Sequence, residues 1–346
     1  MFRERSSLSN QWREYMSSNA KPRPIVATSI GDPAGIGPEI VARAWVTGEA
    51  HKLSRPVLIG SAHAMRKGVE IAKVRATVRV VNGLDGLSDD PQVIDILDDG
   101  ALDPADFQIG KDSEAGGRAN AAWLKRAEQM ARNGEVAATV FAPVSSGSLK
   151  MAKALDVIMP VTPGESYLLL LSGPLRVMHL TDHMPLRKVC DTISEDLTVS
   201  ALQTLHDTFT KWGMPNPRIG VAGLNPHAQG KEDTESLTPG VKRAQAKGIN
   251  VEGPLSPDAV FRHCIEDKYD AVLAMYHDQG HIAIKTWGFS GNCAVIVGPP
   301  YLSMTVAHGT AFDIAGKGIA DHKMILNAMR MAGSMSAGAG FIEEMK

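Results

Sequence analysis

Short apolar segments that each end in turn-forming residues constrain the fold of this 346-residue chain more than any other feature. Runs rich in Val, Ile and Ala that barely alternate with polar residues are typical of strands buried on both faces of a mostly parallel sheet. Five such runs are PIVATSI before GDPAG, AATVFA before PVSSG, LRVMHL before TDHMP, RIGVAGL before NPHAQG, and DAVLAM before YHDQG.

Helical patterns lie between these runs. PEIVARAWV begins with Pro38 and Glu39, which suit the first turn of a helix. GGRANAAWLKRAEQMARNG repeats apolar residues at helical spacing and ends at Gly134, and DLTVSALQTLHDTFTKWG behaves similarly. Alternating strands and helices predict an α/β fold. For the last residues, 331–346, we expect a weakly ordered end or a loose helix.

Composition excludes several classes of protein. A hydrophobic content of 44% and a charged content of 21% are typical of a soluble globular protein. The formal net charge of −2 gives no electrostatic attraction for nucleic acid or an anionic membrane, and no apolar segment approaches the roughly 20 residues that span a bilayer. The N-terminal residues lack the apolar core of a secretory signal. Cys190, Cys264 and Cys293 form no CxxC pair, which argues against disulfides and a cysteine zinc site. We therefore expect a cytoplasmic protein.

Three histidines each follow one of the apolar runs. They are His183 in TDHMP, His227 in NPHAQG and His277 in YHDQG. Ligands of open α/β sheets bind at the carboxyl ends of strands, where these residues are expected to lie. Three imidazoles that leave open positions form the catalytic arrangement for zinc, and imidazole also suits iron, cobalt or nickel. Each histidine alone could instead be a capping or loop residue; together they favour a metal site.

Six other histidines do not clearly follow an apolar run. Four of them are expected to be structural or solvated, and the role of the other two remains ambiguous. The first group is His179, His206, His263 and His322, and the second is His281 and His308.

Two glycine-rich segments are candidates for contact with an anion or a nucleotide. GDPAGIGPEI permits a tight turn, and a helix that begins near Pro38 would present free N–H groups, although a connection without a ligand fits equally well. No GxGxxG follows a strand, so a Rossmann site is not supported. HGTAFDIAGKG, residues 308–318, is either an ordinary loop or a cofactor contact; its candidate cofactor-binding residues are His308, Gly309, Thr310, Asp313 and Gly316.

Three further residues are candidates for acid–base chemistry. Asp278 adjoins His277 and could transfer protons or orient the imidazole. Lys285 ends the apolar HIAIK segment and could polarise a carbonyl, hold a carboxylate, or simply reach solvent from a strand end. Asp258 in GPLSPD is a further candidate near the metal.

Five motifs in order resemble the 4-hydroxythreonine-4-phosphate dehydrogenase (PdxA) family: GDPAGIGPEI, GLNPHA, GPLSPDAVF, AMYHDQG and AHGTAFDIAGKGIAD. The similarity covers about residues 24–330. It implies the two-domain fold of the isocitrate and isopropylmalate dehydrogenases, with mostly parallel sheets and a cleft between the domains. The expected division is a polar extension over 1–23, a first α/β domain of 24–145 plus 300–346, and a second over 146–299.

The same resemblance implies an NAD- or NADP-dependent enzyme that acts on a small hydroxy acid, as a homodimer with its active site near the interface. A divalent metal (Zn, Co, Mg, Mn or Ni) would be held by His183, His227 and His277, not all from one subunit. The family's substrate-contacting lysine falls on Lys285. The implied reaction removes hydride from a secondary alcohol β to a carboxylate, after which carbon dioxide is lost; Asp278, Lys285 or a water between them would manage the protons.

The chain departs from the family pattern where the family holds substrate. The GHTE motif is replaced by Pro163-Gly164-Glu165-Ser166, and the downstream Asn and Arg fall on Ala294 and Ser303. The lysine that usually follows the TxP turn falls on Ser146. These changes remove groups suited to a phosphate. The terephthalate dihydrodiol dehydrogenases, a branch of the family, share HDQGHI and the absence of GHTE, which makes an unphosphorylated cyclic diol carboxylate an alternative substrate.

Two other classes stay open. A phosphate acyltransferase has a related fold and needs no three-histidine site. A non-enzymatic small-molecule binding protein would produce no NADH with any hydroxy acid.

Overall fold

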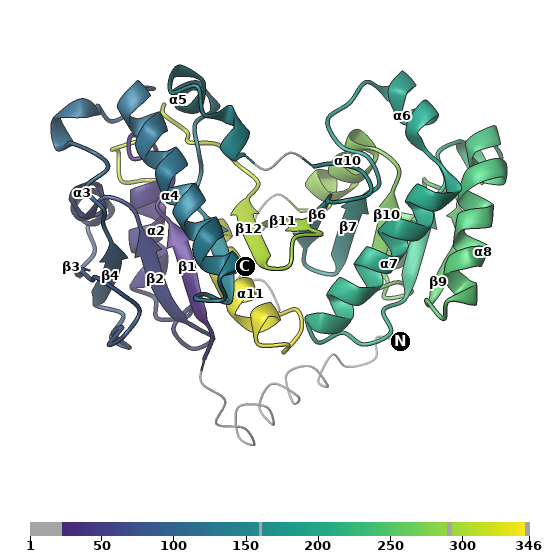
Figure 1. Cartoon of the computed structure of the whole chain (residues 1–346), viewed down its shortest axis with the longest axis horizontal. Helices are drawn as coiled ribbons and strands as arrows, with labels where there is room; N and C mark the ends of the chain where they lie inside the picture. The colour runs from purple at the N-terminus through teal and green to yellow at the C-terminus, as the bar shows by residue number, and fades with distance from the viewer. Residues whose placement is uncertain (1–22, 159–160, 289–292, 343–346) are drawn as a thin grey trace.

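The computed structural model describes residues 23–158, 161–288 and 293–342 (Figure 1). The expected polar N-terminal extension lies outside these residues except at residue 23. Twelve strands form one sheet in the order β3-β4-β2-β1-β5-β12-β11-β6-β7-β10-β8-β9. The strands are β1 Ile25–Ser29, β2 Arg55–Ile59, β3 Thr77–Val80, β4 Val93–Leu97, β5 Ala138–Phe141, β6 Tyr167–Ser172, β7 Leu175–His179, β8 Ile219–Ala222, β9 Val251–Leu255, β10 Ala271–Ala274, β11 Cys293–Val297 and β12 Leu302–Val306.

Most neighbouring strands in this sheet are parallel. Among the described residues, the antiparallel pairs are β6–β7, β6–β11 and β11–β12. All five apolar runs quoted above contain a strand, and each of these strands is buried along its whole length or at all but one residue. The predicted α/β fold with a mostly parallel sheet is confirmed.

Helices cover the faces of the sheet (Figure 1). They are α2 Gly37–Trp45, α3 Ala62–Ala72, α4 Glu114–Arg132, α5 Ser146–Met151, α6 Leu186–Thr192, α7 Glu195–Lys211, α8 Thr238–Ala246, α9 Val260–Ile265, α10 His277–Trp287 and α11 Lys323–Ser336. The two long helices begin with a serine cap: the side chain of Ser113 accepts from the N–H of Gly116, and that of Ser194 from Leu197. Both caps satisfy N–H groups that a helix start leaves without a partner.

The strand order separates the sheet into two halves. The first half comprises β3, β4, β2, β1, β5 and β12, and the second comprises β11, β6, β7, β10, β8 and β9. β12 returns from the second half of the sequence to pair in parallel with β5, while its other edge pairs with β11. Figure 1 shows α2, α3 and α4 beside the first half and α6, α7 and α8 beside the second. The domain boundaries expected near residues 145 and 300 stay a prediction.

Of two local expectations, one held in part and one was wrong. Met331–Ser336 are helical and belong to α11, but this helix is packed and not loose: Met331, Ala332 and Met335 are buried, because α11 packs on β1, β5 and β12. The HIAIK segment lies in α10 and is not a strand. Gly280 and Ile284 are buried four residues apart, which is the period of a helix, and this places Lys285 on an exposed face.

No helix among the described residues combines the length and the apolar character that crossing a membrane requires.

Candidate active site

Three neighbouring parallel strands position the three histidines singled out in the sequence. β10 lies between β7 and β8 and is parallel to both. His183 follows β7, His277 begins the helix after β10, and His227 follows β8. Because parallel strands end at the same edge of a sheet, all three histidines lie along one edge, as predicted.

Side-chain bonds tie the connections at this edge together. The hydroxyl of Thr181 donates to the carbonyl of Met275 (2.8 Å), which joins the loop after β7 to the end of β10. Gln279 accepts from the N–H of Met275 (2.7 Å) and donates to the carbonyl of Gly223 (2.9 Å), which joins the start of α10 to the loop after β8. Gln279, the glutamine of HDQG, therefore links the segments that follow β10 and β8 at the sheet edge where the histidines lie.

His183 and His277 form a group of possible metal ligands with Asp182. One ligand atom from each of these three residues lies within 4.8 Å of the other two. The rings of His183 and His277 are 4.7 Å apart between centroids. Oδ1 of Asp182 is buried without a hydrogen-bond partner in the described part of the chain. A buried carboxylate oxygen beside two imidazoles is a donor set that suits a divalent cation.

Each of the two imidazoles has Nδ1 close to an adjacent carboxylate. Nδ1 of His183 lies 3.0 Å from Oδ2 of Asp182, and Nδ1 of His277 lies 2.7 Å from Oδ1 of Asp278. The bond to His277 holds the pKa of Asp278 below its usual range, so this carboxylate is ionised and accepts. Nδ1–H of His277 therefore donates to Asp278, and Nε2 of His277 keeps its lone pair. A carboxylate on the far nitrogen is the usual support for a metal-binding histidine.

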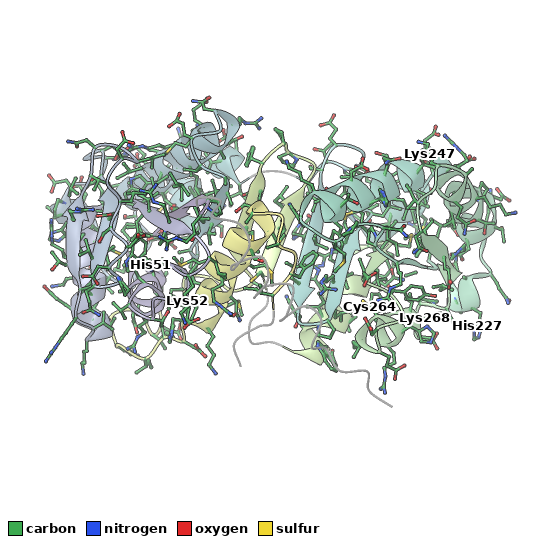
Figure 2. The ribbon with its side chains drawn as sticks, turned by 90° about the horizontal axis from the view of Figure 1, so that it is seen from below. His51, Lys52, His227, Lys247, Cys264 and Lys268 are labelled. Atoms are coloured by element: carbon green, nitrogen blue, oxygen red, sulfur yellow. The ribbon has the colours of Figure 1, made fainter. Side chains whose placement is uncertain are left out.

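His227 lies apart from this group. It is exposed, at the edge of the molecule in Figure 2, and has a φ of 57°. The buried carboxylate of Asp233 holds the surrounding loop by accepting from the backbone of Leu224, Asn225 and Gly230. Within one chain, the structure thus brings together two of the three predicted histidines and leaves His227 elsewhere on the same edge.

Asp258 lies near His227 rather than near His183 and His277. Its pKa is held below the usual range, mainly by a hydrogen bond from the Ser256 hydroxyl (2.7 Å), with a smaller contribution from the charge of His227. Asp258 is exposed. Asp258 and His227 are thus two exposed groups near the ends of β8 and β9.

Two histidines that the sequence analysis did not propose as metal ligands lie in the same cluster of rings. His179 was expected to be structural or solvated and His281 was ambiguous, yet their ring centroids lie 4.9 Å apart. The ring of His281 is stacked on that of His277 at 3.6 Å. The i,i+4 spacing of His277 and His281 could have indicated the stacking had the segment been interpreted as a helix. His308, the other ambiguous residue, bonds through Nδ1 to the carbonyl of Gly309.

The glycine-rich segments meet in the first half of the sheet. β1, β5 and β12 are neighbours, so the turns that follow them adjoin. The N–H of Asp32 donates to the carbonyl of Pro143 (2.9 Å), and that of Ile36 donates to the carbonyl of Thr310 (3.0 Å). A side chain on Gly35 would collide with Thr310 at 2.9 Å.

The start of α2 is covered by these contacts. Gly37, Pro38 and Glu39 are buried, and the Glu39 carboxylate accepts from the N–H of Ala320 (3.0 Å). These contacts favour a packed connection over an anion site at this helix start. In the 308–318 segment, His308, Thr310 and Ala311 are partly exposed, while Gly309, Asp313 and Gly316 are exposed.

The resemblance places three residues, Ser303, Ala294 and Ser146, on the substrate side of the site. Ser303 and Ala294 are 3% and 8% exposed within β12 and β11. Ser146 begins α5 and is exposed, and the hydroxyls of its neighbours Ser145 and Ser148 both donate to the carboxylate of Asp112. Burial raises the pKa of Asp32, whose carboxyl lies close to Ser148.

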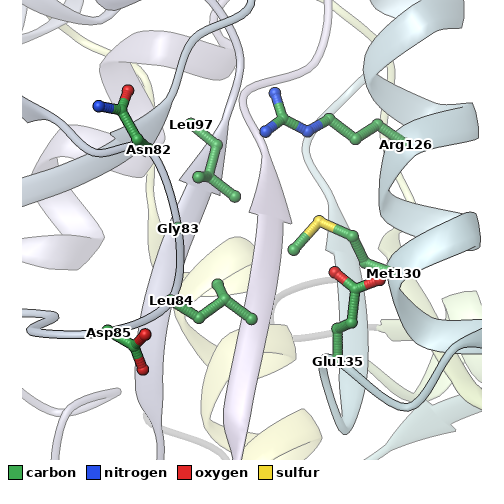
Figure 3. Close-up of a pocket in the computed structure, with 8 residues that line it drawn as sticks. All are labelled: Asn82, Gly83, Leu84, Asp85, Leu97, Arg126, Met130 and Glu135. Atoms are coloured by element: carbon green, nitrogen blue, oxygen red, sulfur yellow. The ribbon is translucent and has the colours of Figure 1, made fainter.

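A cavity of about 320 Å³ lies in the first half, away from these residues (Figure 3). Figure 3 shows the loop of residues 82–85 on one side and Arg126 and Met130 of α4 on the other. None of the predicted site residues lines it. The candidate active site is thus defined by its side chains and not by this cavity.

Comparisons with known proteins agree with the motifs. The sequence profile of the pyridoxal phosphate biosynthetic protein PdxA matches residues 52–332. A protein of Novosphingobium aromaticivorans named "Putative 4-hydroxythreonine-4-phosphate dehydrogenase" is 55% identical over 325 residues, which cover 94% of this chain and 98% of that protein.

Two solved structures are also similar. The 4-hydroxythreonine-4-phosphate dehydrogenase of Klebsiella pneumoniae has a TM-score of 0.81 and 33% identity, covering 90% of this chain and 99% of that one. A terephthalate 1,2-cis-dihydrodiol dehydrogenase of Burkholderia xenovorans has a TM-score of 0.66 and 30% identity, covering 90% and 98%. Enzymes of this group have the isocitrate and isopropylmalate dehydrogenase-like fold, which confirms that expectation. The chain belongs to the PdxA family of pyridoxal phosphate biosynthetic proteins.

Proposed function

We propose that the protein is an NAD(P)-dependent, divalent-metal-dependent dehydrogenase that oxidises and decarboxylates a β-hydroxy acid. The observation that carries this proposal is the grouping of Asp182, His183 and His277 at a strand edge, in a chain of a family whose members are named as dehydrogenases. A phosphate acyltransferase or a simple binding protein would not need this group.

The residues present fit a divalent metal. His183 and His277 would supply Nε2, and the buried Oδ1 of Asp182 is a third donor without another partner among the described residues. If His227 is also a ligand, it comes from a second copy of the chain, because in one chain His227 does not join the group. That arrangement would make the active site depend on a homodimer. A divalent ion held there supplies Lewis-acid stabilisation of an alcohol or enolate oxygen.

The chain's own groups would bind substrate and manage protons. Asp278 is ionised and bonded to His277, which suits it to hold that imidazole in one tautomer. Lys285 lies two turns further along α10, is exposed, and could hold a substrate carboxylate. The exposed part of the 308–318 segment is the proposed contact for the nicotinamide cofactor, which supplies hydride acceptance when bound.

The phosphate-side changes support an unphosphorylated substrate. Ser303, Ala294 and Ser146 carry no charge, whereas the resemblance places an arginine at position 303 and a lysine at position 146. A phosphate placed there would lack these cationic partners, which is unfavourable. The first candidate substrate is a β-hydroxy acid like that of the 4-hydroxythreonine-4-phosphate dehydrogenases. The similarity to a terephthalate dihydrodiol dehydrogenase makes a cyclic diol carboxylate the second candidate.

A screen of β-hydroxy acids tests the proposal. The metal-free protein is supplied with NAD or NADP, one divalent metal at a time, and phosphorylated or unphosphorylated hydroxy acids, and NADH or NADPH is followed by absorbance. We expect turnover that requires both metal and nucleotide and that is lost in His183→Ala. Turnover that persists unchanged in metal-free buffer, or no turnover with any hydroxy acid, would overturn the proposal.

A further inference from the structure

We propose that His281 is a positioning residue that holds the imidazole of His277 with Nε2 directed toward the metal. The inference rests on the proposed metal site and extends it to a residue that contributes no ligand atom to the group of Asp182, His183 and His277.

The first observation is the contact between the two rings. His277 and His281 are four residues apart in α10, so their side chains lie on the same face of the helix. Their ring centroids are 3.6 Å apart and the ring planes differ by 17°, which is face-to-face stacking over most of each ring. A flat neighbour at this distance restricts rotation of the His277 imidazole about its Cβ–Cγ bond.

The second observation is that the ring of His281 is itself fixed. Its Nδ1 lies 3.0 Å from the carbonyl oxygen of His277, and because a carbonyl only accepts, Nδ1–H is the donor. This hydrogen bond links the side chain of His281 to the backbone one helical turn earlier. It orients the His281 ring parallel to the His277 ring.

The third observation is the support behind His281. His179 is fully buried, its Nδ1–H donates to the carbonyl of Leu168 (3.0 Å), and its ring centroid is 4.9 Å from that of His281. A Cβ on Gly280 would lie 2.2 Å from Nε2 of His179, so the start of α10 approaches this ring as closely as a glycine allows. The four imidazoles form a ladder from exposed to buried in the order His183, His277, His281, His179.

The ladder also argues against a ligand role for His281. His277 stands between His281 and His183, and the ring contact of His183 is with His277. Among the described residues, the group of possible metal ligands contains His183 and His277 and not His281. Hydrogen-bonded supports of metal ligands contribute about 10- to 100-fold to metal affinity in proteins, and we expect a stacked support to lie near the lower end of that range.

Cobalt(II) binding to the metal-free protein tests the role, because cobalt reports both affinity and ligand number through its absorption spectrum. Two variants separate the shape of the side chain from its chemistry. His281→Leu fills space without a flat ring, and His281→Phe keeps a flat ring without nitrogen. We expect His281→Leu to weaken cobalt binding about tenfold and His281→Phe to stay within about threefold of the native protein, with the native visible spectrum. His63→Leu, at an exposed histidine in the first half of the sheet, is the matched control.

Three results would overturn the positioning role: native affinity in His281→Leu, equal losses in both variants, or an altered ligand-field spectrum in His281→Phe. The last two would mean that the imidazole itself is required. Failure of the proposed metal site is distinguishable, because native protein and His183→Ala would then bind cobalt equally. Thermal unfolding of the metal-free variants shows whether each is folded.

Discussion

The imidazoles of His183 and His277 lie 4.7 Å apart although 94 positions separate them in the sequence, because they follow the neighbouring parallel strands β7 and β10. Nδ1 of each ring lies 3.0 Å or less from the carboxylate of an adjacent aspartate, Asp182 or Asp278. The strand pairing thus brings two dipeptides, Asp-His and His-Asp, to the same place.

Removal of either imidazole should abolish metal binding without unfolding the protein. His183 is largely exposed and His277 is partly exposed, so neither contributes much to the core. We expect His277→Ala to weaken cobalt or zinc binding by at least about 100-fold, with the melting temperature of the metal-free protein nearly unchanged. Competition with a chromogenic chelator measures the affinity, and His63→Ala serves as the control. Native metal affinity in His277→Ala would exclude this residue as a ligand.

Dimer dependence of the site can be tested by combining two inactive variants. If His183 and His277 act with His227 of a second copy, a purified heterodimer of His183→Ala and His227→Ala chains contains one intact site and one site with both defects. We expect about half of the native activity from this heterodimer, and almost none from either homodimer. Differently tagged chains allow its isolation. An inactive heterodimer would place all the required histidines in one subunit, and an active His227→Ala homodimer would exclude His227 as a ligand.

A histidine far from the candidate site should make stability depend on pH. His51 is 4% exposed, both ring nitrogens lack a partner among the described residues, and burial lowers its pKa from 6.5. The unfolded chain therefore binds a proton that the folded protein excludes, so the stability present above pH 6.5 is lost as the pH falls.

Urea unfolding of metal-free protein between pH 7 and 5.5 checks this expectation. Below the unfolded pKa, His51 should contribute a slope of up to about 1.4 kcal/mol per pH unit. His51→Phe should reduce the slope, and His63→Phe, at an exposed position, should not. Identical slopes in the native protein and His51→Phe would show that His51 is protonated in the folded state.

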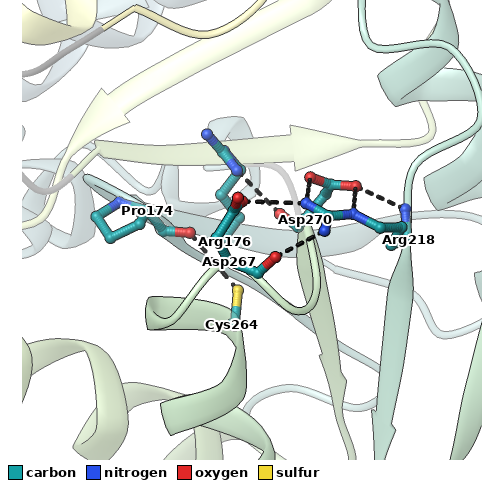
Figure 4. A network of polar contacts seen from close by, with 6 residues as sticks. All are labelled: Pro174, Arg176, Arg218, Cys264, Asp267 and Asp270. Atoms are coloured by element: carbon teal, nitrogen blue, oxygen red, sulfur yellow. Dashed lines mark hydrogen bonds and ion pairs between the residues drawn. The ribbon is translucent and has the colours of Figure 1, made fainter. Parts of the chain in front are cut away.

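An ion-pair network in the second half of the sheet should stabilise the fold unequally through its two aspartates (Figure 4). Asp270 accepts from the backbone N–H of Arg218 (2.7 Å) and from two guanidinium nitrogens, and its side chain is 17% exposed. Burial alone would raise the pKa of Asp270, but these bonds hold it below its usual range. Asp267 pairs with the same arginine while 79% exposed.

We expect Asp270→Asn to lower the free energy of unfolding by about 1–3 kcal/mol, because Arg218 loses a largely buried carboxylate that accepts three of its hydrogen bonds. Asp267→Asn should cost less than about 1 kcal/mol, since an exposed pair contributes little. Urea titrations of both variants provide the comparison. Equal effects would mean that burial does not decide the strength of this network.

The strands and the three strand-end histidines were predictable because both depend on local patterns. Apolar runs followed by turn residues mark buried strands wherever they occur, and parallel strands share one edge. The places of His179 and His281 were not predictable in this way. Their contact joins β7 to α10, and its detection requires the helix that begins at His277. A strand end was one interpretation of HIAIK, whereas this segment forms part of α10, which packs on β6 and β7 and buries Gly280 and Ile284 on one helical face.

Substrate preference is the last prediction, and it follows from charge at the phosphate-side positions. The resemblance places the family's Arg, Asn and Lys at Ser303, Ala294 and Ser146, none of which carries a charge. Each charge-assisted contact with a phosphate contributes about 1.5–3 kcal/mol, so the absence of several should weaken binding by orders of magnitude. We expect 4-hydroxythreonine-4-phosphate to be a poor substrate and an unphosphorylated hydroxy acid, such as a cyclic dihydrodiol carboxylate, to be preferred.

The comparison is kcat/KM for both classes of substrate on one enzyme preparation. Ser303→Arg is a variant that should shift the ratio of the two kcat/KM values toward the phosphorylated compound. Turnover of 4-hydroxythreonine-4-phosphate within about tenfold of the best unphosphorylated substrate would show that other residues, with Arg187 and Lys188 the nearest candidates in sequence to His183, replace the missing charges.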